Sequence, residues 1–255
     1  MSGRLLLVPN TLDLGTVSEG GTPPDLRGVL PQHVIETAAR LGHWVCENAK
    51  TTRAFLKRVD AIVPLLQPLQ ALDIRELPRP AKGRSDMAPP DLRPLLAPAL
   101  AGHDLGLISE AGLPAVADPG AALVTAAHSA GVAVQVLAGP SALLLALAAS
   151  GLNGQSFAFV GYVPQETAAQ AQRLKELEAT SRRLGQTQLM IETPYRNAML
   201  LRALLAALAP TTRLSVSCGL TLAGGWTRTD RVAGWRERRT ELPGDVPAVF
   251  ALLAD

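Results

Sequence analysis

Residues 106–141 read GLISEAGLPAVADPGAALVTAAHSAGVAVQVLAGPS, and this stretch decides the fold. The apolar run at 105–108 predicts a short strand, and residues 121–129 have the apolar spacing of a helix. The β-branched run at 132–137 predicts a second strand. Strand, helix and strand in this order predict a βαβ unit with a long first loop, and therefore an α/β fold.

A turn-rich segment follows each of these strands: SEAGLP at 109–114 and AGPS at 138–141. Open α/β sheets bind ligands at the carboxyl ends of their strands. We therefore expect both turns to lie on one rim and to form a small-molecule site made largely of backbone. Taken alone, each turn also has a simpler interpretation. Ser141 is a good helix N-cap, and Glu110 suits a loop that faces water.

Further strands and helices are predicted along the rest of the chain. Strands and helices alternate in the first half, whereas the second half mixes hairpin-like strands with helices. The interruption GLNGQ predicts a boundary between domains 1–152 and 153–255. The expected helices are 32–41, 51–59 (capped by Lys50-Thr51-Thr52), 142–150, 166–183 and 197–208. The other expected strands are 4–8, 43–47, 157–163, 187–192 and 213–218, followed by a β-rich end over 227–253.

Composition excludes several classes of protein. The net charge of +2 is too small to argue for nucleic-acid binding by itself. No secretory signal is visible, and the longest apolar run, Ala142–Ala149, is far shorter than the roughly 20 residues of a membrane span. We therefore expect a soluble cytoplasmic protein with no membrane association. The two cysteines predict buried thiols.

Motifs that are absent narrow the choice further. The four histidines have no ligand-like spacing, which predicts that no metal is bound. The chain carries no GxGxxG, P-loop or GxSxG motif. A dinucleotide oxidoreductase, a P-loop kinase and an α/β-hydrolase are therefore not favoured.

Four segments together resemble the tetrapyrrole methylase superfamily of S-adenosylmethionine-dependent enzymes. They are ISEAGLPAVADPG (108–120), AGPSALLLALAASGL (138–152), FAFVGYVP (157–164) and IETPYR (191–196). The resemblance is strongest to the branch that methylates ribose 2'-hydroxyls of small-subunit ribosomal RNA. It implies a two-domain α/β fold with a cofactor cleft between the domains, S-adenosylmethionine as cofactor, ribosomal RNA or a ribosomal subunit as partner, and a homodimer.

The resemblance also implies residue roles. The family's acidic G-D-P turn is Gly112-Leu113-Pro114 here, so the backbone of Leu113 and the side chain of Val116 are expected to face the cofactor. Asp118-Pro119-Gly120 is expected to shape the loop and cap the next helix. The full set of expected cofactor-binding residues is Leu12, Glu110, Gly112, Leu113, Val116, Ser141 and Ala142.

Glu192 and Arg196 are the expected catalytic residues, by the same resemblance. Glu192 would orient or deprotonate a substrate hydroxyl, and Arg196 would hold a phosphate. Because they are four residues apart, the two side chains could instead simply pair at the start of a helix. Trp226 and Trp235 could stack on bases, although a role in the core or at a sheet edge is favoured.

Three segments depart from the pattern of the ribosomal RNA branch. VPNTL (8–12) replaces a glycine-rich first loop, CENAKTTR (46–53) lacks an Asp and an Arg, and CGLT (218–221) lacks a Glu and a Lys. These departures keep two alternatives open. One is methylation of a small tetrapyrrole or another acceptor, and the other is a non-catalytic regulatory protein that binds S-adenosylmethionine.

Overall fold

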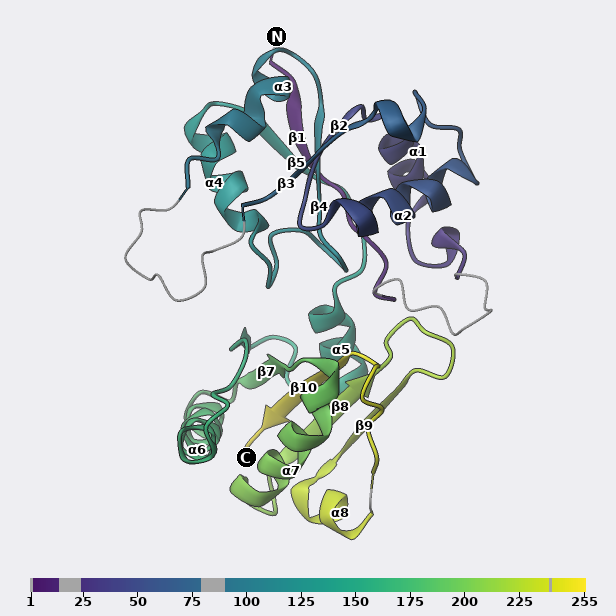
Figure 1. Ribbon diagram of the computed structural model, residues 1–255. Helices are drawn as coiled ribbons and strands as arrows, with labels where there is room; N and C mark the ends of the chain where they lie inside the picture. Colours follow the sequence, from purple (N-terminus) through teal and green to yellow (C-terminus); the bar gives the residue numbers. More distant parts are fainter. Residues whose placement is uncertain (1, 14–23, 79–89, 239) are drawn as a thin grey trace. The chain divides into compact units, whose positions relative to one another are not determined.

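The computed structural model describes residues 2–13, 24–78, 90–238 and 240–255. The chain divides into two units, unit 1 (residues 1–140) and unit 2 (residues 141–255) (Figure 1). The division falls one helix earlier than the boundary expected at residue 152. Helix α5 (Ala142–Ser150) belongs to unit 2 because Ala146 and Leu147 pack against the sheet of that unit.

Unit 1 is built on a parallel five-stranded sheet in the order β3-β2-β4-β1-β5. Its strands are β1 (Arg4–Leu7), β2 (His43–Cys46), β3 (Asp73–Glu76), β4 (Leu105–Ile108) and β5 (Ala133–Val136). Its helices are α1 (Gln32–Arg40), α2 (Ala49–Asp60), α3 (Ala97–Leu100) and α4 (Gly120–Ser129). Short 3-10 turns lie at Leu26–Gly28, Leu69–Ala71 and Arg93–Leu96. The βαβ unit predicted from residues 106–141 is therefore confirmed, as β4, α4 and β5.

Helices cover both faces of this sheet (Figure 1). Trp44 packs with α1 and α2 in one core cluster, whereas its neighbour Val45 belongs to the cluster under α3 and α4. Successive strand residues point to opposite faces, so strands covered on both sides are apolar almost throughout. Gly106 is required opposite Trp44, because a Cβ there would lie 2.7 Å from the indole ring.

Unit 2 carries a mixed five-stranded sheet in the order β6-β7-β10-β8-β9. Its strands are β6 (Phe157–Phe159), β7 (Thr187–Ile191), β8 (Arg213–Cys218), β9 (Trp226–Arg231) and β10 (Ala248–Leu253). The helices after α5 are α6 (Thr167–Leu184), α7 (Asn197–Ala207) and α8 (Val232–Glu237). A 3-10 turn at Pro194–Arg196 directly precedes α7. Strand β6 is parallel to β7, and β10 is antiparallel to both β7 and β8.

Two local expectations were wrong, and one strand was missed. Strand β3 was not predicted, because its sequence DIRE shows no apolar alternation. Residues 232–235 are helical rather than extended, since Val232 and Trp235 are three apart and bury one helical face. Asn48, not Lys50-Thr51-Thr52, caps α2, with its side-chain oxygen accepting the Lys50 N–H.

Candidate functional site

The loops after β1, β4 and β5 meet at one edge of the unit 1 sheet. Strand β1 pairs in parallel with both β4 and β5, so the carboxyl ends of all three strands lie together. The Asn10 N–H donates to the Gly112 carbonyl at 2.9 Å, and the Gly112 N–H donates to the Thr11 carbonyl at 3.3 Å. The shared rim expected for 109–114 and 138–141 is confirmed for 109–114 and 138–140, whereas Ser141 belongs to unit 2. We call residues 9–13, 47–48, 109–119 and 138–140 the loop edge.

Asn10 holds the first two of these loops together. Its Nδ2 donates to the carbonyl oxygens of Ser109 and Glu110, each at 3.1 Å, and its Oδ1 accepts the Thr11 N–H at 2.8 Å. The residue is 7% exposed, so these bonds are shielded from water. The Asn10 side-chain amide therefore joins the first loop to the loop after β4. Sequence reasoning missed this role, because the partners are 99 and 100 residues away.

Two glycines let the backbones at the loop edge approach closely. A Cβ on Gly139 would lie 2.2 Å from the Cβ of Pro9, and one on Gly112 would lie 3.3 Å from Leu12. Gly112 also has a φ of +70°, in the left-handed region that glycine adopts most easily. The backbone of Gly139 therefore lies directly against the Pro9 side chain, and the backbone of Gly112 lies close to the Pro140 carbonyl.

Asp118 fixes the shape of the loop after β4. Its Oδ2 accepts the Ser109 hydroxyl at 2.6 Å, and its Oδ1 accepts the N–H groups of Ala115 and Gly120, each at 2.8 Å. This confirms the expectation that Asp118-Pro119-Gly120 shapes the loop and caps the next helix. Ala115 and Ala117 both have positive φ, and Val116 between them is 45% exposed. Strained backbone that presents an exposed apolar side chain is typical of ligand sites.

The loop edge also carries negative charge. The Glu110 N–H donates to the Glu47 carboxylate at 3.1 Å, and the Glu110 carboxylate accepts from Asn48 at 3.2 Å. Burial raises the pKa of Glu47, the neighbouring charges of Asp118 and Glu110 raise it further, and the Glu110 N–H partly opposes them. Neither Glu47 nor Glu110 forms an ion pair with a cation among the described residues. A cationic ligand group would be favoured here.

The other expected cofactor residues are spread over both units. Leu12 is buried, and Leu113 is half-buried. Ser141 and Ala142 are half-buried and open α5 in unit 2. Ser141 stands at the N-cap of α5, but its hydroxyl makes no capping bond. Its backbone carbonyl accepts the Leu145 N–H. Their role in binding stays a prediction.

Glu192 and Arg196 lie at the carboxyl end of β7 in unit 2. Arg196 Nε and Glu192 Oε2 are 3.3 Å apart, and the other Glu192 oxygen accepts the Thr193 N–H at 2.8 Å. Both side chains are largely buried. The Glu192–Arg196 ion pair that the sequence suggested is therefore present. A catalytic role for either residue stays a prediction.

Two exposed tyrosines at this edge of unit 2 were missed by the sequence reasoning. Tyr162 follows β6 and is 59% exposed, and Tyr195 follows β7 and is 72% exposed. Because β6 and β7 are parallel, both tyrosines follow strand ends at the same edge. Trp235 is buried, its Nε1 donates to the Leu214 carbonyl, and Arg228 lies 4.1 Å above its ring. Trp235 is a core residue.

Neither metal-binding nor membrane-spanning features emerge from the described residues. None of their His, Cys, Asp and Glu side chains form a group of three or more that could hold a metal ion. No helix in this part of the chain is long and apolar enough to cross a membrane. Cys46 and Cys218 are buried and form no disulfide, and burial raises the pKa of both thiols.

The fold defines an α/β protein with a parallel sheet in unit 1 and a mixed sheet in unit 2. Residues 24–229 match the family of tetrapyrrole (corrin/porphyrin) methylases, and the chain belongs to this family. Two solved structures show a similar fold. They are uroporphyrin-III-C-methyltransferase from Thermus thermophilus (TM-score 0.50, 18% identity, 99% of this chain and 93% of that one) and the methyltransferase CobJ (TM-score 0.58, 17% identity, 99% and 95%).

Curated relatives carry the name ribosomal RNA small subunit methyltransferase I. The protein from Vibrio cholerae is 42% identical over 97 residues, which are 38% of this chain and 32% of that protein. The one from Xylella fastidiosa is 44% identical over 85 residues, 33% and 31% of the two chains. The Escherichia coli O157:H7 protein is 29% identical over 181 residues, 62% of each. The chain thus matches about a third of the length of the first two relatives.

Proposed function

We propose that this protein is an S-adenosylmethionine-dependent methyltransferase that acts on a ribose 2'-hydroxyl of small-subunit ribosomal RNA. The single observation that carries the proposal is the loop edge, where backbone from three strand ends meets around Gly112 and Gly139. Two of its segments, SEAGLP and AGPS, also carry the resemblance to the ribosomal RNA branch. A cytoplasmic homodimer is part of the same proposal, by resemblance to the family.

The residues of the loop edge fit the cofactor chemically. S-adenosylmethionine supplies a methyl group activated by a positive sulfonium. Glu47 and Glu110 supply negative charge without a cationic partner among the described residues. Val116, which is 45% exposed, offers apolar surface to the adenosine group. Ser141 and Ala142, which directly follow Pro140, complete the proposed set.

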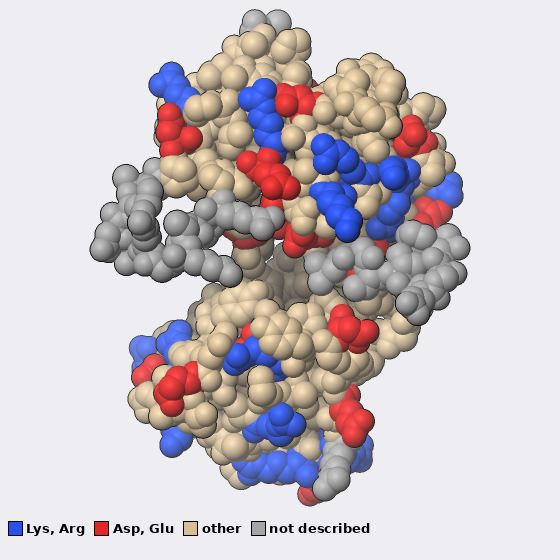
Figure 2. Space-filling view, in the orientation of Figure 1, with Lys and Arg blue, Asp and Glu red and all other residues tan. Residues whose placement is uncertain are grey.

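Three features support RNA as the acceptor. Lys50, Arg53 and Lys57 are exposed on α2 and form no ion pair with any described residue. Figure 2 shows Lys and Arg side chains gathered over the part of unit 1 that contains α1 and α2. Cations at spacings of three and four on one helix suit a phosphate backbone. Tyr162 and Tyr195 are exposed rings on which unpaired bases can stack.

Glu192 and Arg196 are the proposed catalytic residues. A buried carboxylate can orient or deprotonate a ribose hydroxyl, which is a weak acid. Arg196 has its Nε directed to Glu192, which leaves its terminal amino groups for a phosphate. The protein's main task is then to align the hydroxyl in line with the methyl group.

The proposal is tested by transfer of labelled methyl groups from S-adenosylmethionine to intact small ribosomal subunits, naked ribosomal RNA, total protein and a uroporphyrinogen, assayed side by side. We expect label in ribose of subunits or RNA. Label in the tetrapyrrole alone, or cofactor binding without transfer to any acceptor, contradicts the acceptor assignment. Ala142→Trp should abolish calorimetric binding of S-adenosylhomocysteine, whereas Ala149→Trp, at an exposed position of the same helix, should not. Failure of the unaltered protein to bind at millimolar ligand contradicts the cofactor assignment.

A further inference from the structure

The last turn of α2 carries an arginine that is bonded to the first loop of the loop edge. Arg58 Nη2 lies 3.0 Å from Asp13 Oδ2, and Arg58 Nη1 donates to the Thr11 hydroxyl at 3.3 Å. The same Nη2 donates to the Pro24 carbonyl at 2.8 Å. One guanidinium therefore joins the first loop, residue 24 and the end of a helix.

These contacts are largely shielded from water. The side chains of Arg58 and Asp13 are 18% and 7% exposed, and Thr11 is 2% exposed. Desolvation of two buried charges offsets most of their attraction, so a buried ion pair contributes little net stability. Arg58 Nε is also buried and makes no hydrogen bond with any described residue, which adds to the cost. The main effect of this pair is to fix the position of the segment that it holds.

The segment that Arg58 holds surrounds Leu12, one of the residues predicted to bind the cofactor. Thr11 and Asp13 flank Leu12, and the Thr11 hydroxyl donates to Asp13 Oδ1 at 2.8 Å. The Thr11 carbonyl accepts the Gly112 N–H at 3.3 Å. A Cβ on Gly112 would lie 3.3 Å from Leu12 Cδ2. Arg58 therefore acts on both sides of Leu12, and through this segment on the turn at Gly112.

The opposite end of α2 is bonded to the second loop of the same edge. Asn48 caps the helix, and its Nδ2 donates to the Glu110 carboxylate at 3.2 Å. The helix has 12 residues and is about 18 Å long at 1.5 Å per residue. It therefore contacts the loop after β4 near its first turn and the first loop at its last turn.

We propose that Arg58 is a positioning residue of the proposed cofactor site, and that it holds the first loop in the arrangement that binds S-adenosylmethionine. The inference rests on the cofactor assignment of the proposed function. Arg58 acts through Thr11 and Asp13 rather than on the methyl group. When a loop keeps its binding arrangement for only a fraction of the time, the apparent affinity falls by that fraction. Arg58 therefore sets the affinity for the cofactor and not the rate of methyl transfer.

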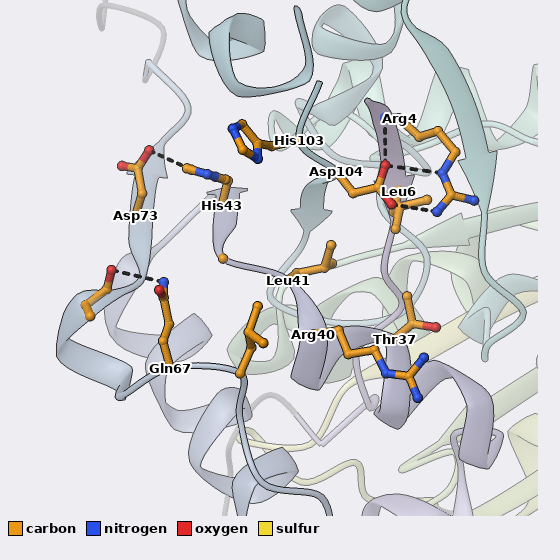
Figure 3. Close-up of a pocket in the computed structure, with 13 residues that line it drawn as sticks. Arg4, Leu6, Thr37, Arg40, Leu41, His43, Gln67, Asp73, His103 and Asp104 are labelled. Atoms are coloured by element: carbon orange, nitrogen blue, oxygen red, sulfur yellow. Dashed lines mark hydrogen bonds and ion pairs between the residues drawn. The ribbon is translucent and has the colours of Figure 1, made fainter. Parts of the chain in front are cut away.

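A control for the lost charge lies at the other end of the same sheet. Arg4 begins β1, and its guanidinium pairs with Asp104 beside a cavity of about 550 Å³ at the amino-terminal ends of the unit 1 strands (Figure 3). None of the residues that line this cavity belongs to the loop edge. Arg4→Gln therefore removes an arginine–aspartate pair from unit 1 and leaves the contacts of the first loop in place.

A second control separates loop position from global stability. Leu96 is fully buried in the core cluster under α3 and α4, and it is not part of the loop edge. Leu96→Ala should lower the free energy of unfolding, because it leaves a cavity in the core. It should not change the affinity of the folded protein for the cofactor.

Three measurements on the full chain test the proposal: calorimetric affinity for S-adenosylhomocysteine, urea denaturation without ligand, and hydrogen exchange of the Asn10 and Gly112 amides. Both amides donate across the first two loops, so their exchange reports the loop arrangement with no ligand present. We expect Arg58→Gln to weaken binding about tenfold, as for a loop that keeps its binding arrangement about a tenth of the time. Exchange at both amides should accelerate by more than the change in global stability explains.

Two further variants and one kinetic measurement sharpen the test. Arg58→Lys keeps the charge but not the planar fork that reaches Thr11 and Asp13 together, so its affinity should lie between those of the unaltered protein and Arg58→Gln. Thr11→Val removes one acceptor of the guanidinium without changing any charge, and it should weaken binding even if Arg58→Gln does not fold. In methyl transfer, Arg58→Lys should raise the KM for S-adenosylmethionine and leave kcat nearly unchanged.

The possible failures are distinct. Unchanged affinity and unchanged amide exchange in the Arg58 variants would overturn the positioning role and leave the cofactor assignment intact. Equal weakening in Arg58→Gln and either Arg4→Gln or Leu96→Ala would mean that binding follows charge or global stability, and would overturn it as well. If the unaltered protein does not bind S-adenosylhomocysteine at millimolar concentration, the cofactor assignment is wrong, and this inference is wrong with it.

Discussion

The Ser109 hydroxyl donates a hydrogen bond to Asp118 Oδ2 at 2.6 Å, which ties the end of β4 to the start of α4. Between the two residues lie Ala115 and Ala117, both with a left-handed backbone. That conformation costs roughly 1–2 kcal/mol for each non-glycine residue. One carboxylate therefore holds a strained loop in a single shape, at the position where the cofactor is proposed to bind.

Removing this carboxylate should release the loop. We expect Asp118→Ala to lower the free energy of unfolding by about 1–3 kcal/mol, because it leaves the Ala115 and Gly120 N–H groups without their acceptor. S-Adenosylhomocysteine should also bind more weakly. Urea denaturation and calorimetry measure the two effects. Asp118→Asn keeps an acceptor oxygen and should recover much of the loss, whereas equal loss in both variants would point to charge rather than to loop shape.

The contact between Pro9 and Gly139 should be sensitive to a single methyl group. A Cβ at residue 139 would lie 2.2 Å from the Cβ of Pro9, so the first loop must move. We expect Gly139→Ala to destabilise the protein by about 1–3 kcal/mol and to weaken cofactor binding. Gly154→Ala is the control, because a Cβ there meets nothing within 4 Å. Thermal denaturation of the two variants should differ clearly, and matching melting temperatures would contradict the close contact.

Glu47 should oppose folding at neutral pH. Burial raises the pKa of Glu47 in the folded protein above the unfolded value of about 4.3. The stability that the protonated carboxyl contributes is therefore fully present below the unfolded pKa, and it is lost as the pH rises through the folded pKa. We therefore expect Glu47→Gln to stabilise the ligand-free protein at pH 7 by less than about 1 kcal/mol, and the difference should vanish near pH 4. Urea denaturation at several pH values measures this.

Glu166 provides the opposite case. Its carboxylate accepts the Ala168 and Ala169 N–H groups at the start of α6, and these bonds lower its pKa. Glu166→Gln should therefore destabilise the protein at pH 7, and less so in acid. The same direction of change in both variants would contradict the electrostatic assignment at the loop edge.

The ion pair of Glu192 and Arg196 yields a kinetic prediction. Glu192→Gln should lower turnover by about 10²–10⁴-fold, as for a lost general base, and leave cofactor affinity nearly unchanged. Arg196→Ala should mainly weaken RNA binding and make it less dependent on salt. Because the two side chains are 3.3 Å apart, the double variant should not be additive. Unchanged methylation by Glu192→Gln would remove this residue from the chemistry.

The exposed cations of α2 lead to a prediction about affinity alone. Lys57→Gln should weaken RNA binding and make the slope of log affinity against log salt shallower by about 0.7–0.9, the value for one lost phosphate contact. Filter binding over a range of salt concentrations measures it. Lys175→Gln, an exposed lysine of α6, is the control and should leave the slope unchanged. Equal effects would mean that α2 is not a specific contact surface.

Local sequence patterns determined most of the elements. The βαβ unit at 105–137 was predicted from apolar periodicity and from the glycines and prolines of its turns, and α5 matches its predicted bounds at both ends. Parallel pairing then implied that SEAGLP and AGPS would share a rim. The resemblance to the family also followed from local motifs, since each is a short continuous segment of the chain. Failures occurred where local preference was weak, as in β3, or where burial made a helix of residues 232–237.

Only the tertiary structure decided which side chains meet. Strand β4 lies between β2 and β1, and this order brings Asn10 to Ser109, Glu110 to Glu47, and His43 to His103. Periodicity and turn chemistry report on a few neighbouring residues, whereas these contacts join residues about 60 to 100 apart. The sequence of the first loop departs from the family pattern. In the fold, Asn10 holds this loop in place through its bonds to Ser109 and Glu110. The cavity opposite the loop edge likewise exists because four strands begin side by side, which no single segment specifies.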